Sequence, residues 1–329
     1  MMDMFRKAAA IAAALIMLAG CSSSGSSNSS SATESAAVSS EEAPVTTAAP
    51  AETEPEEEKL TEEEYMEKCK NTVVELMPDA FDGKHQDYTY PEFQKLSYYS
   101  KTAERDTPVN VLLPADYSED KQYPVLYILH GYWDSEDWMA RPVVNLNKIL
   151  KNLQENGEAE DMIIVCPYIF CSKELPRCTG MNDENTLAYD NFINDLLTDL
   201  MPFIESKFSI AKGPENTAIT GFSMGGRESL FIGIKHPELF GYIGACCPAP
   251  GLIGQIKESD MVFPEDQKPR LLFISSSQAD GVVSTFPDSY RKAFEKNGVD
   301  FVSHVLKRTG HDHTSVRPHL YNFLRMIFK

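Results

Sequence analysis

The sequence predicts an α/β fold: a mostly parallel, doubly wound sheet with helices on both faces. From about residue 90 to residue 329, short apolar runs of strand length alternate with segments whose apolar residues recur at helical spacing. These roughly 240 residues are enough for one large α/β domain. In addition, a serine between glycines stands where an expected strand meets a helix, in the segment GFSMGG at residues 221–226.

The first two expected strands form a hairpin, and the later strands alternate with helices, which is the pattern of a parallel sheet. Strands are expected at residues 97–101, 109–113, 123–130, 162–167, 217–220, 242–246, 270–274 and 301–306. Helices are expected near residues 144–153, over 189–204, after residue 223, over 290–296 and at the end of the sequence. The segment 189–204 predicts one long amphipathic helix.

Ser223 is the centre of a G-x-S-x-G motif directly after the strand expected at 217–220. At such a nucleophile elbow the serine occupies strained backbone at a sharp turn, and the flanking glycines leave room for the neighbouring strand and helix. The helical spacing of Leu230, Ile234 and Leu239 agrees with this context. The motif therefore predicts a serine hydrolase with the α/β-hydrolase fold, in which the acid and the histidine follow the serine along the chain.

His311 is the expected general base. Five of the seven histidines follow Ser223: His236, His304, His311, His313 and His319. The first lies on the helix that leaves the elbow, the second in an expected strand and the last in the closing helix. His311 and His313 share the loop TGHDHT after the last expected strand. His311 is nearer the carboxyl end of that strand, where the active site gathers, and His313 is the alternative.

Asp280 is the expected acid, because it is the first carboxylate after the strand expected at 270–274. A buried aspartate there would hold the Nδ1–H of the histidine and stabilise the imidazolium. Asp288 is the next candidate, and Asp280 as a simple helix cap is the alternative interpretation. The pair His130-Gly131, which ends an early buried strand, predicts an oxyanion hole with the backbone N–H groups of Tyr132 and Met224 as donors.

The first residues indicate export. Arg6 and Lys7 precede an apolar run over residues 8–19, which is too short for a membrane span of about 20 residues and is typical of a signal peptide. The run ends in LAGC at residues 18–21, which resembles a bacterial lipobox. Residues 1–21 are therefore expected to be a lipoprotein signal peptide with Cys21 as the lipid-attachment residue, placing the protein outside the cytoplasm on the cell membrane. An ordinary signal peptide with an incidental cysteine is the alternative.

Residues 22–64 predict a disordered Ser/Glu-rich tether without apolar periodicity. Eleven glutamates and one lysine give this segment a charge of −10, about half of the −19 of the whole sequence. This acidity argues against nucleic-acid binding. Residues 65–89 are expected to form a short helical lead-in of unassigned role, with Tyr65, Cys69, Val73 and Leu76 on one side, before the domain over 90–329.

Six cysteines remain after Cys21. Cys166, Cys246 and Cys247 lie in or beside expected strands and are interpreted as small core residues. Cys171 and Cys178 share a loop, and a disulfide between them is left open. No Cys/His spacing is typical of a metal site and no glycine-rich phosphate loop is present, so neither metal nor cofactor is expected.

From residue 97 onward the chain resembles an esterase family that contains bacterial feruloyl esterases and acetyl xylan esterases. The segments that carry the resemblance are YSKT at 99–102, YPVLYILHG at 123–131, GFSMGG at 221–226, YIG at 242–244 and TGHD at 309–312. The resemblance implies that Ser223, Asp280 and His311 are the catalytic triad. Many feruloyl esterases continue after His-Gly with a glycine pair, whereas this chain has YWDSEDW at 132–138. Trp133 is therefore a candidate contact for the substrate, with Tyr168 and Phe170; ordinary packing is the alternative for all three.

The expected function is that of a membrane-tethered carboxylester hydrolase that removes feruloyl or acetyl groups from a plant polysaccharide such as xylan, or from its oligosaccharides. The polysaccharide is an expectation from the resemblance, because a fold does not determine a substrate. One alternative is another acyl chemistry on the same fold: a siderophore or small-thioester hydrolase, or an acyltransferase. The other is a non-catalytic lipoprotein that binds glycans.

Overall fold

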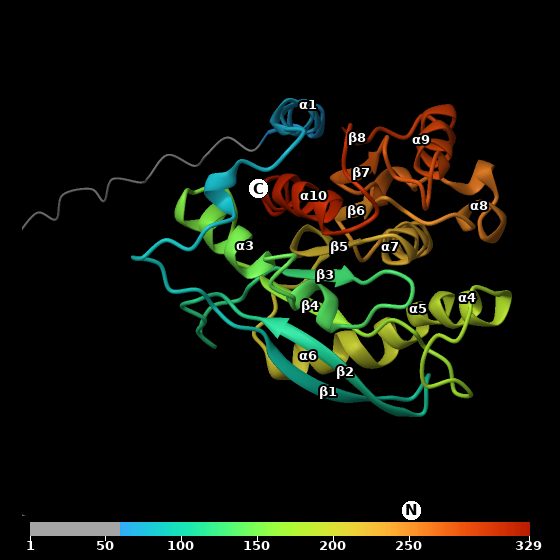
Figure 1. Ribbon diagram of the computed structural model, residues 1–329, viewed down its shortest axis with the longest axis horizontal. Coiled ribbons are helices and arrows are strands. Elements are labelled where there is room, and N and C mark those ends of the chain that lie inside the picture. Colours follow the sequence, from blue (N-terminus) through green and yellow to red (C-terminus); the bar gives the residue numbers. More distant parts are fainter. Residues whose placement is uncertain (1–59) are drawn as a thin grey trace, which may run out of the picture. The chain divides into compact units, whose positions relative to one another are not determined.

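The structure is a computed structural model and describes residues 60–329. The predicted signal peptide, Cys21 and the tether up to residue 59 lie outside the described residues. Between residues 60 and 329 the chain forms an eight-stranded sheet in the order β1-β2-β4-β3-β5-β6-β7-β8 (Figure 1). The strands are β1 Gln94–Ser100, β2 Arg105–Leu112, β3 Val125–Leu129, β4 Ile163–Pro167, β5 Thr217–Gly221, β6 Tyr242–Cys246, β7 Leu271–Ser277 and β8 Val302–Leu306.

The sheet confirms the predicted α/β fold. β1 and β2 form the predicted antiparallel hairpin, and β2 is also antiparallel to β4. All the other pairings, from β4 to β8, are parallel. The carboxyl ends of these parallel strands therefore lie at one edge, where loops from distant parts of the chain meet.

Ten α-helices are seen in the described part of the chain. They are α1 Glu62–Thr72, α2 Asp137–Ala140, α3 Leu146–Glu155, α4 Asp183–Asp190, α5 Phe192–Asp195, α6 Met201–Lys207, α7 Met224–Lys235, α8 Leu252–Gln255, α9 Phe286–Lys296 and α10 His313–Met326. None of them has the length and apolarity that a membrane crossing requires.

Two hydrophobic cores lie on opposite faces of the sheet, because side chains along a strand alternate between its faces. Val125 and Tyr127 of β3 pack in one core with helices α5, α7 and α9. Leu126 and Ile128 pack in the other core with α1, α3 and α10. Burial on both faces explains why the central strands are continuous apolar runs and do not alternate with polar residues.

The prediction of one continuous helix over residues 189–204 is wrong. The segment is helical but is divided into α4, α5, a π-helical turn over Leu196–Leu200, and α6. Pro202 stands in the first turn of α6. Proline has no N–H and its ring collides with the carbonyl four residues earlier, so a regular α-helix cannot continue through this position. The widened π turn accommodates the proline and keeps the apolar residues on the sheet.

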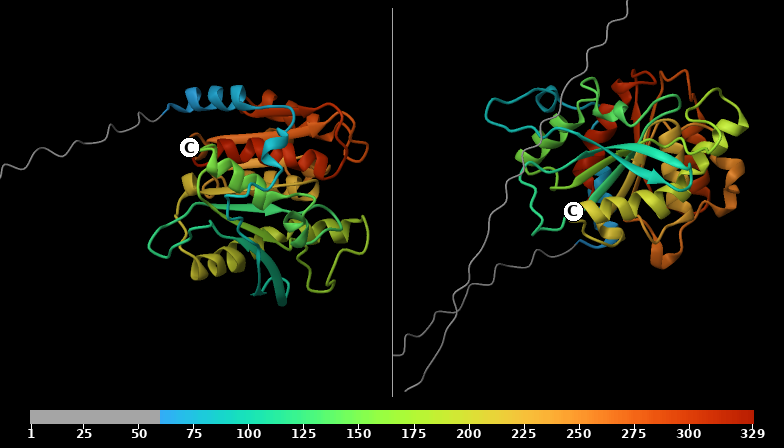
Figure 2. Two further views of the ribbon diagram at one scale, coloured as in Figure 1. Left: turned by 60° about the vertical axis from the view of Figure 1, so that its left-hand side comes forward. Right: turned by 90° about the horizontal axis from the view of Figure 1, so that it is seen from below.

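Helix α1 begins at Glu62, inside the segment predicted as tether, because Thr61 and Glu64 form a capping box. The helix ends at Thr72, so the prediction that Val73 and Leu76 share its buried side is wrong, and Leu76 is 57% exposed. Tyr65 and Cys69 are buried as predicted. Figure 2 shows α1 beside α10, where the Tyr65 hydroxyl donates to the carbonyl of Met326.

The six cysteines among the described residues are free thiols. Cys166, Cys246 and Cys247 are buried, as predicted for core residues. The disulfide that the sequence left open between Cys171 and Cys178 is not formed in this structure.

Candidate active site

The sharp turn between β5 and α7 holds Ser223 in strained backbone, with φ 57° and ψ −115°. The glycines of the motif are required by close backbone contacts. A Cβ added at Gly221 would lie 2.4 Å from the carbonyl of Gly225, and one added at Gly225 would lie 2.3 Å from the Leu129 oxygen. The Ser223 N–H donates to the Cys246 carbonyl at 2.9 Å, which fixes the turn against β6. The predicted nucleophile elbow thus has the backbone of such a turn.

Ser223, His311 and Asp280 form a continuous hydrogen-bonded chain, although they come from the loops after β5, β8 and β7. The His311 Nε2 lies 2.8 Å from the Ser223 Oγ, and the His311 Nδ1 lies 2.6 Å from the Asp280 Oδ2. The Asp280 side chain is fully buried. Its second oxygen, Oδ1, accepts from the N–H groups of Val282 and Val283 at 2.8 and 3.2 Å.

These two contacts define which nitrogen of the His311 imidazole carries the proton. An ionised Asp280 can only accept, so the Nδ1–H of His311 donates to it, and Nε2 keeps a lone pair for the Ser223 hydroxyl. The structure thus brings together Ser223, His311 and Asp280, the three residues selected from the sequence. The two alternatives lie elsewhere: His313 begins α10, and Asp288 pairs with Arg291 on α9.

The loop that carries His311 is held by hydroxyl groups that the sequence analysis missed. The Ser277 hydroxyl donates to the Thr309 carbonyl, and the Ser315 hydroxyl donates to the Gly310 carbonyl at 2.6 Å. Asp312 caps α10 by accepting from the Thr314 N–H at 2.8 Å. The local signal for this cap, an aspartate two residues before a threonine at a helix start, is present in the sequence.

His130 positions the predicted oxyanion loop. It is buried, its Nδ1 donates to the Gly131 carbonyl at 2.8 Å, and its Nε2 accepts from the Ile169 N–H at 3.1 Å. Burial lowers the pKa of His130 to about 4, so the ring is neutral at physiological pH. A Cβ added at Gly131 would lie 3.5 Å from the Ser223 Cβ, so this loop runs next to the nucleophile. The N–H groups of Tyr132 and Met224 stay the predicted oxyanion donors.

A second carboxylate, which the sequence analysis did not select, lies beside this loop. Burial raises the pKa of Asp134 to about 6, against the opposing attraction of Arg141 and His311. Its Oδ2 would lie 3.3 Å from a Cβ at Gly131, so a side chain at Gly131 would press on Asp134 as well as on the nucleophile turn.

The three aromatic residues selected as substrate contacts have different surroundings. Phe170 is 3% exposed and packs edge-on against Tyr189 with ring centroids 5.2 Å apart, so its assignment to the cleft is wrong. Tyr168 is half-buried and stacks on His130 at 5.5 Å. Trp133 is 54% exposed at a positive φ of 71°, next to the oxyanion loop. Trp133 is the one of the three whose ring is free for a ligand.

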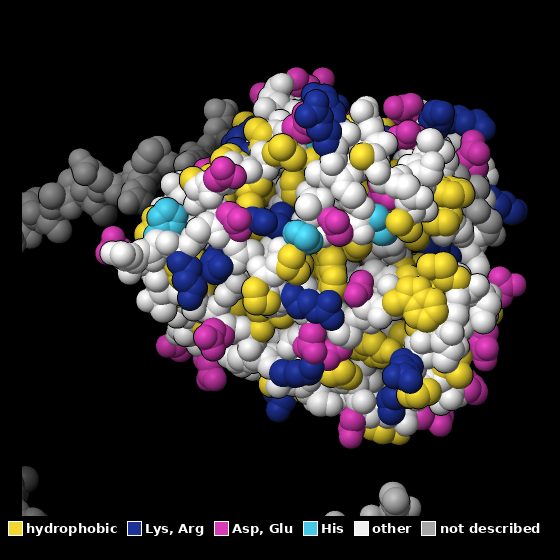
Figure 3. All heavy atoms as spheres, viewed as in Figure 1, with side chains coloured by type: hydrophobic (Ala, Val, Ile, Leu, Met, Phe, Trp, Pro, Cys, Tyr) yellow, Lys and Arg dark blue, Asp and Glu magenta, His cyan; other side chains and the backbone are white. Residues whose placement is uncertain are grey.

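Other exposed hydrophobic residues belong to the same loops and adjoining helices. Hydrophobic side chains reach the surface between charged ones on the face drawn in Figure 3. The other exposed hydrophobic residues include Met181, Leu187 on α4, Val282 in the loop that carries Asp280, and Phe286 at the start of α9. Gly180, just before Met181, is tied to the oxyanion loop because its carbonyl accepts from the Tyr132 hydroxyl at 2.9 Å.

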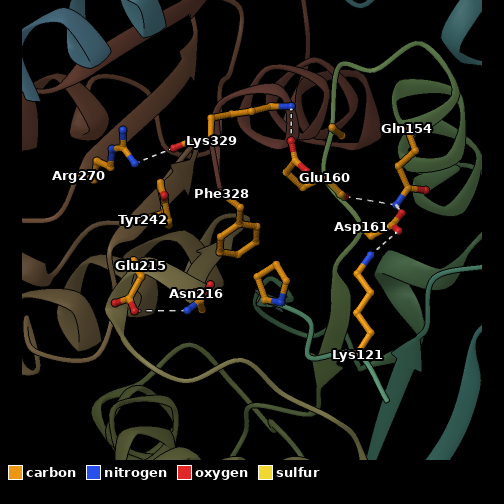
Figure 4. A pocket seen from close by; sticks show the side chains of 12 residues that line it. Lys121, Gln154, Glu160, Asp161, Glu215, Asn216, Tyr242, Arg270, Phe328 and Lys329 are labelled. Carbon is orange, nitrogen blue, oxygen red and sulfur yellow. Dashed lines mark hydrogen bonds and ion pairs between the residues drawn. The ribbon is translucent and has the colours of Figure 1, made fainter. Parts of the chain in front are cut away.

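A groove of about 590 Å³ lies at the opposite edge of the sheet and contains none of the predicted site residues. Its lining comes from the segments before β3, β4, β5 and β7 and from the end of the chain (Figure 4). Ion pairs cross its rim, with Lys121 bonded to Asp161 at 3.2 Å and Lys329 to Glu160 at 2.8 Å. Since parallel strands present catalytic residues at their carboxyl ends, this groove is not the candidate active site.

A buried ion cluster supports the elbow from α7. Arg227 is fully buried, and its guanidinium contacts the carboxyl groups of Asp190 on α4 and Glu228 on α7. The Arg227 N–H donates to the Ser223 carbonyl at 3.0 Å, so the first turn of α7 links the cluster to the nucleophile. Burial raises the pKa of Glu228 from 4.5 to about 8, against the opposing attraction of Arg227. The sequence analysis missed this cluster because its partners lie on separate helices.

The Glu228→Gln variant should have a different pH dependence of stability. Folded Glu228 keeps its proton up to about pH 8, whereas in the unfolded chain it ionises near pH 4.5. Between these values the folded state binds more protons, so the free energy of unfolding falls as pH rises, by up to about 1.4 kcal/mol per pH unit. Glutamine cannot ionise, so this contribution disappears. Urea unfolding at pH 5, 6.5 and 8 measures the difference, with the exposed Glu238→Gln as control. Parallel profiles for wild type and Glu228→Gln would contradict the assignment.

Comparisons with known proteins show similarity to esterases. The family described as "Putative esterase" matches residues 100–285, a range that includes Ser223 and Asp280 and ends before His311. A solved ferulic acid esterase from Anaeromyces mucronatus, in complex with ferulic acid, is 36% identical. It superimposes with a TM-score of 0.74 over 78% of this chain and 97% of that one. The fold is that of an α/β-hydrolase.

Two curated relatives match this chain over a small part of their own length. The endo-1,4-β-xylanase/feruloyl esterase of Xylanibacter ruminicola is 27% identical over 188 residues, 55% of this chain. Endo-1,4-β-xylanase Y of Acetivibrio thermocellus is 29% identical over 144 residues, 41% of this chain. The chain spans 25% and 12% of the length of these two relatives. The chain belongs to the esterase family named above, and the enzyme class predicted from its motifs is confirmed.

Proposed function

We propose that the chain is a serine carboxylester hydrolase that removes feruloyl or acetyl groups from an acylated plant polysaccharide such as xylan. The observation that carries the proposal is the hydrogen-bonded chain from Ser223 through His311 to Asp280. Its geometry is the one that acyl transfer requires, with a nucleophile and base 2.8 Å apart and the base oriented by a buried carboxylate.

In the proposed mechanism, Ser223 Oγ attacks the ester carbonyl while His311 Nε2 takes the hydroxyl proton. Asp280 keeps the imidazole in the required tautomer and stabilises the imidazolium that forms. His311 then gives the proton to the departing sugar hydroxyl, which leaves an acyl-enzyme on Ser223. Water, deprotonated by the same histidine, releases the carboxylic acid and restores the serine.

The oxyanion of each tetrahedral intermediate needs donors placed beside Ser223. We assign this role to the backbone N–H groups of Met224, the residue after the nucleophile, and Tyr132, in the loop that His130 holds. Donors of this kind stabilise negative charge that develops only in the transition state, and one of them is worth about 10²–10³ in rate. Because they are backbone groups, their position depends on the rigidity of the elbow and of the His130–Gly131 turn.

The substrate class is the less direct part of the proposal. It is supported by the Xylanibacter ruminicola relative, whose name joins xylanase and feruloyl esterase, and by the solved relative in complex with ferulic acid. An anchor to the bacterial membrane through a lipid on Cys21 also belongs to the proposal and rests on the sequence alone. Metabolic labelling with palmitate, present in the wild type and lost in Cys21→Ser, tests it.

Initial rates with methyl ferulate, acetylated xylan and p-nitrophenyl acetate test the function. We expect hydrolysis of the small acetate ester and of at least one plant-type ester, and no turnover by Ser223→Ala. Failure on both plant-type esters, with good activity on small thioesters, would favour the alternative acyl chemistry. Absence of turnover on all three esters would support the non-catalytic alternative.

Trp133→Ala should impair methyl ferulate more than p-nitrophenyl acetate, because an exposed ring beside the oxyanion loop can stack on an aromatic acyl group or a sugar. A stacking contact is worth about 0.5–1.5 kcal/mol, so kcat/KM for the ferulate should fall about 2–13-fold relative to the acetate. Trp133→Phe should recover much of the loss. Equal losses on both esters would mean that the tryptophan supports the loop and does not contact substrate.

A further inference from the structure

Cys247 lies against the acid and the base of the candidate triad. It directly follows β6, is fully buried and has a positive φ of 45°. Its N–H donates to the Ser275 carbonyl at 2.9 Å, which fixes its backbone against β7. The Cys247 Sγ, a carboxylate oxygen of Asp280 and a ring nitrogen of His311 all lie within 4.8 Å of one another. This cluster could not be predicted from the sequence, because its members come from three separate loops.

We propose that Cys247, Asp280 and His311 form a binding site for a thiophilic divalent cation, Zn²⁺ being the representative, and that the bound cation switches the esterase off. One sulfur, one nitrogen and one oxygen ligand are a donor set that zinc takes, with bond lengths of about 2.0–2.3 Å. Three protein ligands leave the fourth tetrahedral position to water, as in open zinc sites.

The movements required are small. Ligand atoms of a tetrahedral zinc site lie about 3.4–3.6 Å apart, given those bond lengths. The contact between Asp280 and His311, now 2.6 Å, would widen by less than about 1 Å. The Cys247 sulfur, up to 4.8 Å from its partners, would move closer by at most about 1.3 Å. The thiol also defines the class of cation, because Mg²⁺ and Ca²⁺ prefer oxygen ligands.

Inhibition follows from the proton balance at the imidazole. Zinc binding releases the thiol proton of Cys247 to solvent, and His311 must supply one lone pair. If Nδ1 binds the metal, its proton moves to Nε2, which then cannot accept the proton of Ser223. If Nε2 binds the metal, the lone pair that faces Ser223 is used. In both arrangements the histidine stops acting as a base.

The first test is zinc inhibition of p-nitrophenyl acetate hydrolysis by metal-free protein. We expect the wild type to lose activity at micromolar zinc. Cys247→Ala and the nearly isosteric Cys247→Ser should each need at least about tenfold more zinc, with each rate compared with that variant's own metal-free rate. Cys178→Ser, which removes a half-buried thiol outside the cluster, is the matched control and should follow the wild type. Magnesium at the same concentrations should not inhibit.

The second test measures metal binding by absorption spectroscopy, in a variant without the nucleophile. Cobalt(II) titrated into Ser223→Ala should produce thiolate-to-cobalt charge-transfer absorption and the intense visible bands of a tetrahedral site. Both signals should be lost in Ser223→Ala/Cys247→Ser. Zinc added to the cobalt-loaded protein should remove them.

The outcomes separate this proposal from the proposed function. The inhibitory effect rests on that function, whereas the cobalt spectrum does not. Two results would overturn the proposed inhibition by zinc. One is equal zinc inhibition of the wild type and both Cys247 variants; the other is an active wild type that zinc does not inhibit. A cobalt-loaded protein without Cys247-dependent charge transfer would overturn the site itself, even if the protein proves to have no esterase activity.

Discussion

Replacing Ser223 with alanine should lower kcat for ester hydrolysis by about 10⁵–10⁶-fold, because no covalent acyl intermediate can form without the hydroxyl. The folded structure should persist, since the substitution removes one oxygen and leaves the turn and its glycines unchanged. Residual activity above the uncatalysed rate is expected from the oxyanion donors and substrate binding alone. The measurement is kcat on p-nitrophenyl acetate with circular dichroism and thermal unfolding on the same sample.

A control variant shows whether the loss of activity is specific to the Ser223 hydroxyl. Ser229→Ala removes another buried hydroxyl from α7, one that donates to the Gly225 carbonyl at 2.7 Å, and should keep most of the activity. A Ser223→Ala protein that is folded and still hydrolyses esters at wild-type rates would mean that a different nucleophile operates.

The second large effect is expected for Asp280→Asn, which should lower kcat by about 10⁴-fold. The asparagine amide can donate to the His311 Nδ1, which stabilises the tautomer with its proton on Nε2. In that tautomer the histidine cannot accept the proton of Ser223. The loss should therefore fall mainly on kcat and not on KM. Comparison of kcat and KM on p-nitrophenyl acetate tests it.

Asp288→Asn and His313→Gln are the controls for the assignment of Asp280 as the acid and His311 as the base. Asp288 pairs with Arg291 on α9 and is half-exposed, and His313 lies at the start of α10. Both variants should retain activity within a few-fold of wild type. If Asp288→Asn were as damaging as Asp280→Asn, the assignment of the acid would need to be revised.

The grouping of Ser223, His311 and Asp280 could be predicted from the sequence because each residue follows a strand that the apolar pattern reveals. Ser223 carries a local motif. Chain order leaves five of the seven histidines, and the expected helices and strand leave the two in one loop. The choice of Asp280 needed only the position of the preceding strand. These are short-range signals combined with one topological rule, that the carboxyl ends of parallel strands meet.

Other parts of the site depend on contacts between distant segments. The pairing of Arg227 with Asp190 requires α4 to dock on α7, and apolar periodicity does not specify which helices meet. Phe170 was misassigned because a residue just after a strand end can turn either to the cleft or to the core. The interruption in the 189–204 helix had a local signal in Pro202, since proline cannot continue a regular α-helix. The approach of Cys247 to the triad had no local signal.

The docking of α1 has a consequence for how a large substrate reaches the enzyme. Arg270 stands just before β7, and its guanidinium lies over the Tyr65 ring at 4.2 Å and near Glu62. The first turns of α1 therefore lie at the amino-terminal edge of the sheet, whereas Ser223 lies at the carboxyl-terminal edge. With the function proposed above, a long polymer would reach Ser223 at the carboxyl-terminal edge of the sheet, away from the start of α1.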